Sequence, residues 1–225
     1  TLKELLNHKY NIILKARQLG ISTLTAAYSL WLMTFRNDKN ILVLATKQDT
    51  AKNLVTKIRV MHSNLPNWLK QKCIEDNKLS LRYKNGSQVK AVSSSEDSGR
   101  SEALSLLVLD EAAFIDKIDT IWAAAQQTLS TGGQCIALST PNGVGNWFHR
   151  TWVDAEEGVN GFHPIKLHWT VHPERNDTYR VEQDKLLGPS LAAQECDCDF
   201  LTSGQMVVDG VILQEYKDNF CSEPI

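Results

Sequence analysis

A basic segment near the start of the chain has the residue types of an anion-binding loop. It runs KARQLGIS from Lys15 to Ser22, after a short apolar run and before a long apolar helix pattern. A nucleoside triphosphate needs backbone N–H groups around its phosphates, a cation, and a hydroxyl for magnesium. The common sequence solution is G-x-x-x-x-G-K-[ST], and Gly20 and Ser22 match its second glycine and final hydroxyl. The segment therefore predicts a phosphate loop.

Two positions of the segment depart from that pattern. Lys15 replaces the first glycine, and Ile21 replaces the usual lysine. Because isoleucine cannot contact a phosphate, we expect Lys15 to reach the β- and γ-phosphates and Arg17 to act as a second cation. A plain strand-to-helix turn with exposed basic residues is the alternative, because short motifs give false positives. The predicted phosphate-binding residues are Lys15, Ala16, Arg17, Gln18, Leu19, Gly20, Ile21, Ser22 and Thr23.

A pair of carboxylates follows a second apolar run, LLVL at 106–109. In phosphate-loop ATPases the first acid of such a pair holds magnesium and the following glutamate polarises the attacking water. Asp110, with the Ser22 hydroxyl, is the predicted Mg²⁺ site, and Glu111 is the predicted catalytic base. A solvated strand end is the alternative. The four aliphatic residues before the pair and the apolar residues 112–115 after it favour the functional interpretation.

A third apolar run, at 135–138, ends in Ser139-Thr140-Pro141. Beside the acidic strand, the hydroxyls of Ser139 and Thr140 are expected to contact the γ-phosphate and relay its loss. A serine–threonine cap before a loop that starts with proline explains the segment equally well when it is taken alone.

The elements that position these residues alternate between strand and helix patterns. Asn85-Gly86 at the centre of 79–92 predicts a hairpin turn, and Pro66 is expected to open a short helical piece. The alternation predicts an α/β fold, a phosphate-loop NTPase with a mainly parallel central sheet flanked by helices, of the additional-strand, RecA-like class. Buried strands are expected at 10–15, 40–45, 105–109, 135–138 and 162–169, and helices at 22–35, 48–62, 118–129 and 147–157.

Composition limits the class of protein. The 225 residues are 42% apolar and 22% charged, which fits one large globular domain. A net charge of -2 gives no general attraction to nucleic acid. The apolar runs are shorter than the roughly 18–20 residues of a membrane span, and an intracellular protein is expected. A solvated helix face is expected to carry Lys47, Lys52, Lys57 and Arg59. Free thiols, rather than a zinc site, are expected at Cys73, Cys135, Cys196, Cys198 and Cys221.

Together these motifs resemble the large terminase subunit of tailed bacteriophages. The loop is similar to a variant phosphate loop in which the lysine stands at the first position. LDEAAFI and STPNG resemble the family's acidic and coupling motifs. The likeness extends over roughly residues 10 to 205, with further similar segments at 145–148 and 194–200.

The resemblance implies binding of ATP and Mg²⁺, and ATP hydrolysis that drives double-stranded DNA into a preformed capsid. It implies an ATPase domain over 1–195, with 196–225 as a linker or the start of a nuclease domain. No nuclease carboxylate cluster is present to carry over, so no nuclease activity is expected of these residues. The implied partners are DNA, the portal protein, the small terminase subunit and further copies of the chain in a ring on the procapsid. The implied location is the host cytoplasm, with no membrane.

Two arginines acquire roles through this resemblance. Arg17 resembles the family's in-loop arginine, and Arg100, in SGRS at 98–101, is a candidate arginine finger. A plain exposed loop arginine remains the alternative for Arg100. The family's adenine-binding glutamine would precede Thr1.

Two other functions share these motifs. A helicase-like ATPase would use the same loop and acidic pair, but it normally needs a second core domain. A nucleotide-binding assembly switch with little turnover is the second alternative. The unusual position of the lysine supports this alternative.

Overall fold

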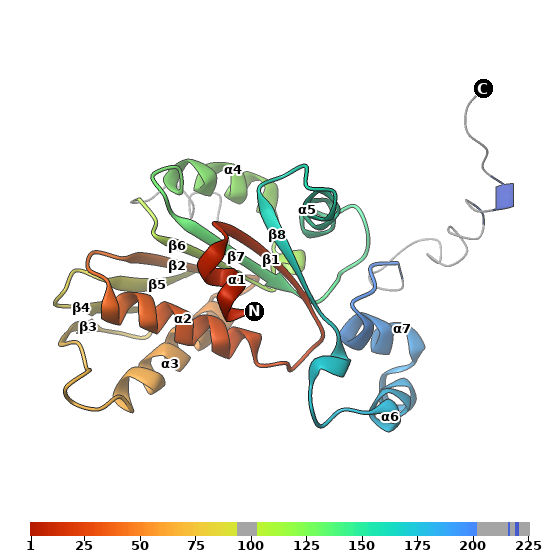
Figure 1. Cartoon of the computed structure of the whole chain (residues 1–225), viewed down its shortest axis with the longest axis horizontal. Coiled ribbons are helices and arrows are strands. Elements are labelled where there is room, and N and C mark those ends of the chain that lie inside the picture. Colours follow the sequence, from red (N-terminus) through yellow and green to blue (C-terminus); the bar gives the residue numbers. More distant parts are fainter. Residues whose placement is uncertain (94–102, 202–215, 217–218, 221–225) are drawn as a thin grey trace.

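The structure is a computed structural model that describes residues 1–93, 103–201, 216, 219 and 220. Strands and helices alternate along most of this part of the chain (Figure 1). The strands are β1 (Tyr10–Lys15), β2 (Asn40–Ala45), β3 (Cys73–Asp76), β4 (Ser80–Tyr83), β5 (Gln88–Ser93), β6 (Leu106–Asp110), β7 (Gln134–Ser139) and β8 (Phe162–Leu167). The helices are α1 (Leu2–Asn7), α2 (Ile21–Phe35), α3 (Gln48–Ser63), α4 (Ile118–Thr128), α5 (Trp147–Glu156), α6 (Asp177–Leu187) and α7 (Pro189–Ala192).

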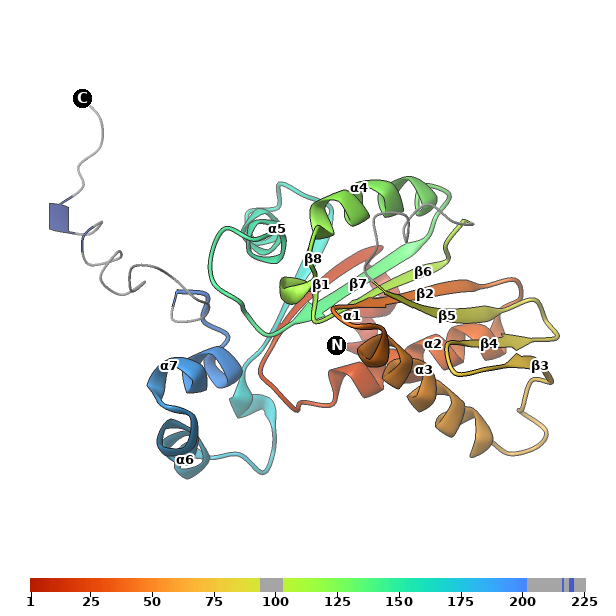
Figure 2. The same cartoon turned by 180° about the vertical axis from the view of Figure 1, so that it is seen from behind.

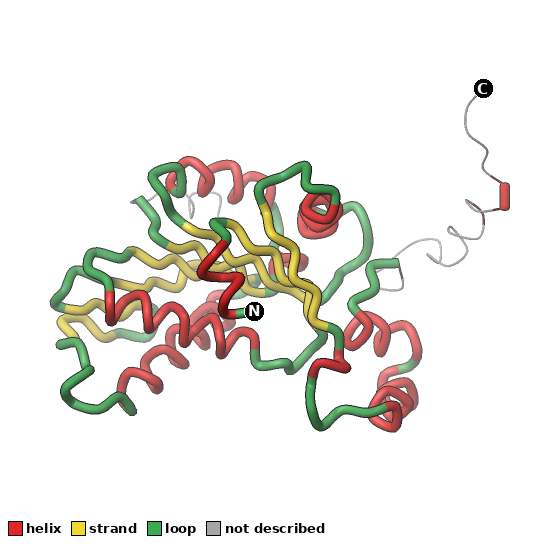
Figure 3. The backbone as a smooth tube through the Cα atoms, in the orientation of Figure 1, coloured by secondary structure: helices red, strands yellow, loops and turns green. Residues whose placement is uncertain are grey.

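The eight strands of the described residues, drawn in yellow in Figure 3, form one sheet. Their order in the sheet is β3-β4-β5-β2-β6-β7-β1-β8. Strands β5, β2, β6, β7, β1 and β8 pair in parallel from one to the next, whereas β4 is antiparallel to both β3 and β5. Strand β7 pairs with both β1 and β6. The predicted α/β fold and its extra strand between the loop strand and the acidic strand are therefore confirmed.

Helices cover both faces of the sheet (Figures 1 and 2). Successive side chains of a strand point to opposite faces, so neighbouring residues of β1 belong to different apolar clusters. Ile13 packs on the side of α2 and α3, whereas Ile12 packs on the side of α4 and α5. Continuous apolar strands are typical of parallel sheets buried on both faces. The buried sheet therefore holds the carboxyl ends of β1, β6 and β7 in fixed positions.

Most predicted elements are confirmed, with differences at their ends. β1 and β2 match the predicted ranges, and the hairpin turn contains Gly86 with φ of +83°. The helical piece expected at Pro66 is wrong, because those residues form a turn closed by the Leu69 N–H to the Pro66 carbonyl. The strand expected to reach 169 stops at Leu167.

The segment after β8 folds back against the phosphate-loop end of the sheet (Figure 1). It contains α6, α7 and a π-helical turn at Ala193–Asp197, none of which the apolar patterns predicted. Cys196 and Cys198 are buried in the cluster that contains α4 and α5 residues. The domain boundary expected after residue 195 stays a prediction. In the described residues, no helix has the length and apolar character needed to cross a membrane.

Candidate nucleotide site

The predicted phosphate loop connects the end of β1 to the start of α2. Gly20 precedes the helix with φ of +76°, and Gln18 has φ of +59°. A Cβ on Gly20 would have nothing within 4 Å, so the backbone conformation, rather than space, favours glycine there. The first N–H groups of a helix have no acceptor within it, so α2 offers donors to an anion.

Two N–H groups of the predicted loop are already used by the protein. The Ala16 N–H donates to the Leu167 carbonyl at 2.8 Å, and the Arg17 N–H donates to the Glu195 carbonyl at 2.7 Å. These two residues therefore do not offer backbone donors to a phosphate in this structure. Thr23 lies exposed in the first turn of α2.

The position of the missing lysine faces the core. Ile21 is 8% exposed and belongs to the apolar cluster on the side of α2 and α3. A lysine at the end of β1 provides the positive charge instead. The side chain of Lys15 is buried, and its Nζ lies 2.9 Å from Glu111 Oε1. The ammonium group of Lys15 therefore lies at the acidic pair, and its contact with a phosphate stays a prediction.

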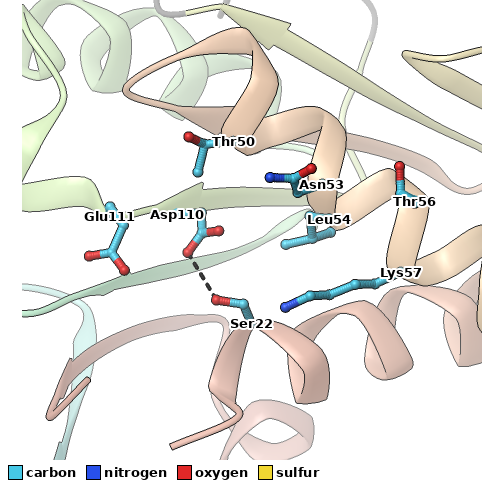
Figure 4. A pocket seen from close by; sticks show the side chains of 8 residues that line it. All are labelled: Ser22, Thr50, Asn53, Leu54, Thr56, Lys57, Asp110 and Glu111. Carbon is cyan, nitrogen blue, oxygen red and sulfur yellow. Dashed lines mark hydrogen bonds between the residues drawn. The ribbon is translucent and has the colours of Figure 1, made fainter. Parts of the chain in front are cut away.

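Ser22 and Asp110 bring the loop and the acidic strand together. The Ser22 hydroxyl donates to Asp110 Oδ1 at 3.3 Å (Figure 4). Asp110 is 5% exposed, and its burial, followed by the Glu111 carboxylate, raises its pKa, while Lys15 and the hydrogen bond from Ser22 oppose the change. Mg²⁺ takes oxygen ligands, so a hydroxyl beside a buried carboxylate fits this ion.

Glu111 has an unusual backbone conformation and three contacts. Its φ of +55° is in the left-handed region, where strained residues often mark functional sites. Besides Lys15, Glu111 Oε2 accepts from the Ser139 hydroxyl and the Thr140 N–H, each at 3.4 Å. The Ser139 hydroxyl also accepts from the Ala113 N–H at 3.2 Å. The two hydroxyl-bearing residues therefore contact the predicted catalytic carboxylate.

Two cavities adjoin these residues. A cavity of about 460 Å³ is lined by Ser22, Thr50, Asn53, Leu54, Thr56, Lys57, Asp110 and Glu111 (Figure 4). A second cavity, of about 600 Å³, is lined by Arg17, Thr46, Thr50, Glu111, Phe114, Thr140 and Glu195. Glu111 lines both, so the predicted base has open space on two sides.

Lys57 lines the first cavity, a position that the sequence interpretation did not predict. It was expected on a solvated helix face, but its ammonium group points into the first cavity towards Ser22 (Figure 4). Its positive charge also opposes, to a small extent, the rise in the pKa of Asp110. Thr50, Asn53 and Lys57 recur at helical spacing on the side of α3 that faces the sheet end. This polar stripe on α3 is the sequence pattern from which the position of Lys57 at the cavity could have been predicted.

Two further residues hold the loop from the segment after β8. Arg17 Nη1 pairs with Glu195 Oε1 at 3.0 Å, in addition to the backbone contact between these residues. Arg175 donates from Nη1 to the Arg17 carbonyl at 3.0 Å and from Nη2 to the Gln18 carbonyl at 3.4 Å. Nearby, Gln194 Nε2 donates to the Pro141 carbonyl at 3.0 Å. Glu195 stood in a segment noted for its family likeness, whereas Arg175 had no motif. Arg100 lies outside the described residues.

Comparisons with known proteins show what the chain is similar to. The family model described as terminase large subunit, T4likevirus-type, N-terminal, matches residues 12–206. The large terminase subunit of Thermus virus P23-45 is 32% identical over 133 residues, which are 51% of this chain and 26% of the relative. That of Thermus phage G20c is 31% identical over the same shares. The chain therefore spans only about a quarter of the length of these curated relatives.

Solved structures show the same fold. The large terminase ATPase domain of Thermus phage P74-26 superposes with a TM-score of 0.69 at 23% identity, over 86% of this chain and 89% of that one. The large terminase of a second thermophilic bacteriophage, in complex with ADP, gives a TM-score of 0.68 at 13% identity, over 87% of this chain and 49% of that one. Because the family model also matches most of its length, the chain belongs to the terminase large-subunit family, T4-like-virus type, and has the fold of the N-terminal ATPase domain.

Proposed function

We propose that this terminase ATPase domain hydrolyses ATP with Mg²⁺, and that the hydrolysis powers translocation of double-stranded viral DNA into a procapsid. The observation that carries the proposal is the pair of contacts between the loop and the acidic strand. Ser22 meets Asp110, and Lys15 meets Glu111, although β7 separates the two strands. Support for ATP as the nucleotide comes from the large terminase of the second thermophilic bacteriophage, whose structures are described as complexes with ADP and ATP-gamma-S.

Each site residue has a proposed role. Ser22 and Asp110 would hold the Mg²⁺ ion, which neutralises phosphate charge when it is bound. The N–H groups at the start of α2 and the Lys15 ammonium bind phosphate oxygens, and Arg17 provides a second cation. Glu111 orients the attacking water and accepts its proton. Ser139 and Thr140, which contact Glu111, respond to the γ-phosphate through that carboxylate.

The contact between Lys15 and Glu111 gives the site two arrangements. Without nucleotide the lysine neutralises the glutamate at 2.9 Å. A γ-phosphate competes for the ammonium group and leaves the carboxylate to the water. Binding of the complete triphosphate is therefore coupled to the release of the base.

We also propose partners for the whole protein. They are DNA, the portal protein, the small terminase subunit and further copies of the chain on a procapsid in the host cytoplasm. The family match and the fold shared with a structure described as the Phi-28 gp11 DNA packaging motor, with a TM-score of 0.52, support a packaging role.

Glu111→Gln tests the proposed hydrolysis. The substitution keeps the side-chain size but removes the proton acceptor, so we expect ATP affinity within a few fold of the original and turnover lower by about 10²–10⁴-fold. Equilibrium binding of labelled ATP and phosphate release measure the two quantities. The matched control is Glu157→Gln, at the end of α5, which should change neither quantity. Equal turnover of Glu111→Gln and the original chain would contradict the assignment of the base.

A nucleotide switch with little turnover is the second candidate, because the ion pair with Lys15 keeps Glu111 engaged in the nucleotide-free protein. The two functions are distinguished by assembling the complete terminase with portal and DNA. Turnover that stays absent there, with ATP bound, would favour the switch. Low turnover of the isolated domain would not, since an arginine supplied in trans can contribute ~10³–10⁵ in rate.

A further inference from the structure

Three potential metal ligands meet at the end of the sheet opposite the phosphate loop. Glu4 and His8 lie one helical turn apart at α1, and His163 lies on the edge strand β8. Glu4 Oε2 is 3.2 Å from His8 Nε2 and 3.2 Å from His163 Nε2. The three ligand atoms all lie within 4.8 Å of one another, and all three residues are partly buried. In the described residues this is the one such group of histidine, cysteine, aspartate and glutamate side chains.

We propose that Glu4, His8 and His163 bind a divalent transition-metal ion, and that Zn²⁺ is the ion that best suits these ligands. Two imidazoles and one carboxylate, with a water as the fourth ligand, form a common zinc donor set. Metal–ligand distances of about 2.0–2.1 Å in a tetrahedron place the ligand atoms about 3.3 Å apart. Both oxygen-to-nitrogen distances are already close to this value. The lone pair of each Nε2 atom lies in its ring plane, so the two rings have to unstack and turn towards each other before both can point at one ion.

The two imidazoles are neighbours before any ion binds, and the backbone that carries them is fixed. The His8 and His163 rings stack with centroids 3.8 Å apart and planes 5° apart. Leu5 of α1 is buried, and its carbonyl accepts from Gln134 Nε2 at 3.3 Å. Helix α1 is therefore docked on the sheet, so ion binding has little chain ordering to overcome.

Asn11 of β1 contacts the backbone of His8 and lies beside His163 in the sheet. It is 1% exposed, its Nδ2 donates to the His8 carbonyl at 3.0 Å, and it lies in register with His163 on the neighbouring strand. Its Oδ1 has no hydrogen-bond partner within the described part of the chain. A buried acceptor without a donor is costly, so this atom favours a water or another donor near the His8 carbonyl.

The site is separate from the proposed nucleotide site. His163 is in register with Asn11, and Leu167 with Lys15, so four residues of strand, roughly 13 Å, separate the two places. Metal binding joins α1 to the exposed edge strand β8 across β1. It can therefore be measured without nucleotide and without turnover.

The test is metal binding by the untagged chain without nucleotide. Titration calorimetry with Zn²⁺ should show one ion per chain, and Co²⁺ should give the strong visible absorption of a tetrahedral site. Glu4→Gln and His163→Ala should each weaken Zn²⁺ affinity by more than about tenfold. The matched control is His172→Ala, which removes a partly exposed loop histidine outside the group and should leave binding unchanged.

Three results would overturn the proposal. They are no stoichiometric binding, binding that Glu4→Gln and His163→Ala leave unchanged, and a sulfur-to-cobalt absorption band, which would place the ion on cysteines. Circular dichroism of each variant checks folding. Glu4→Gln keeps the size of a partly exposed side chain, so it gives a result even if His163→Ala does not fold.

Discussion

Lys15 enters the site from the strand before the loop, whereas the usual lysine would come from the helix after it. The buried position of Ile21 explains the exchange, because a charge there would lie in the apolar cluster beneath α2. Lys15 is 6% exposed at its side chain, yet its ammonium group has a carboxylate partner. Burial of this charge is therefore compensated.

Substitution of Lys15 tests whether the relocated charge serves the nucleotide. Lys15→Met keeps the apolar stem but removes the ammonium group, so we expect weaker ATP binding and turnover lower by at least about 10²-fold. Arg17→Gln is the comparison, and it should have a smaller effect because the Arg17 side chain is largely exposed. Unchanged binding and turnover in Lys15→Met would transfer the phosphate role to Arg17.

Asp110→Asn should stabilise the nucleotide-free protein while removing the proposed metal site. A raised pKa means that the folded protein favours the protonated acid, so the ionised form costs stability as the pH rises past its unfolded pKa of ~3.9. Asparagine cannot ionise, and its advantage should grow from acid to neutral pH. Thermal melts at both pH values measure it, with about 2–4 °C expected per kcal/mol.

The converse is expected with ligand. Mg²⁺ and ATP together should raise the melting temperature of the original chain but not that of Asp110→Asn. An equal melting temperature of the two proteins at every pH would contradict the cost that we assign to the buried carboxylate.

At the scale of elements, the phosphate loop is held from outside by the segment after β8. Arg175 donates to two loop carbonyls, and its guanidinium lies 4.6 Å from the centre of the Tyr179 ring at the start of α6. Glu195 holds Arg17 from the π-helical turn. The loop conformation thus depends on elements more than 150 residues later in the chain.

Arg175→Ala should loosen the loop. Each lost hydrogen bond is worth about 0.5–1.5 kcal/mol, so we expect a several-fold increase in the KM for ATP and a smaller change in kcat. Steady-state kinetics distinguish the two. Arg150→Ala, which removes an arginine paired with Asp119 away from the site, is the control and should change neither constant. An effect confined to kcat would show that Arg175 acts on the chemical step.

Apolar patterns and motif order predicted every described strand except β3, which has no apolar run. They also predicted most of the candidate site, because β1, β6 and β7 each end in chemically distinctive residues. They could not predict partners that arrive through tertiary folding. Arg175 and the contact of Ser139 with Glu111 depend on strand order and on the path of the chain after β8. Lys57 was missed because helical charges are usually solvated, and only the packing of α3 turns this lysine inward.

At the scale of the whole molecule, the cysteines report which segments are packed into the core. Cys135 and Cys198 are buried, and burial raises the pKa of both thiols, that of Cys198 to about 12. Cys196 is buried as well, whereas Cys73 is only partly so. Thiols that are both enclosed and protonated react slowly.

Alkylation resolved by mass spectrometry should therefore label Cys73 first among these four cysteines in the native protein. Cys135, Cys196 and Cys198 should be labelled only after denaturant is added. Labelling of Cys196 and Cys198 as fast as Cys73 would indicate that the chain leaves the ATPase domain near residue 195. Slow labelling of Cys196 and Cys198 would indicate that the ATPase domain extends past residue 195.

The π-helical turn has a mechanical consequence. Gln194 donates a hydrogen bond to the Pro141 carbonyl after β7, and its neighbour Glu195 forms an ion pair with Arg17 in the loop after β1. The π-helical turn therefore contacts the carboxyl ends of two neighbouring strands, β7 and β1. A displacement of one strand end relative to the other would therefore strain the π-helical turn, because the turn is bonded to both.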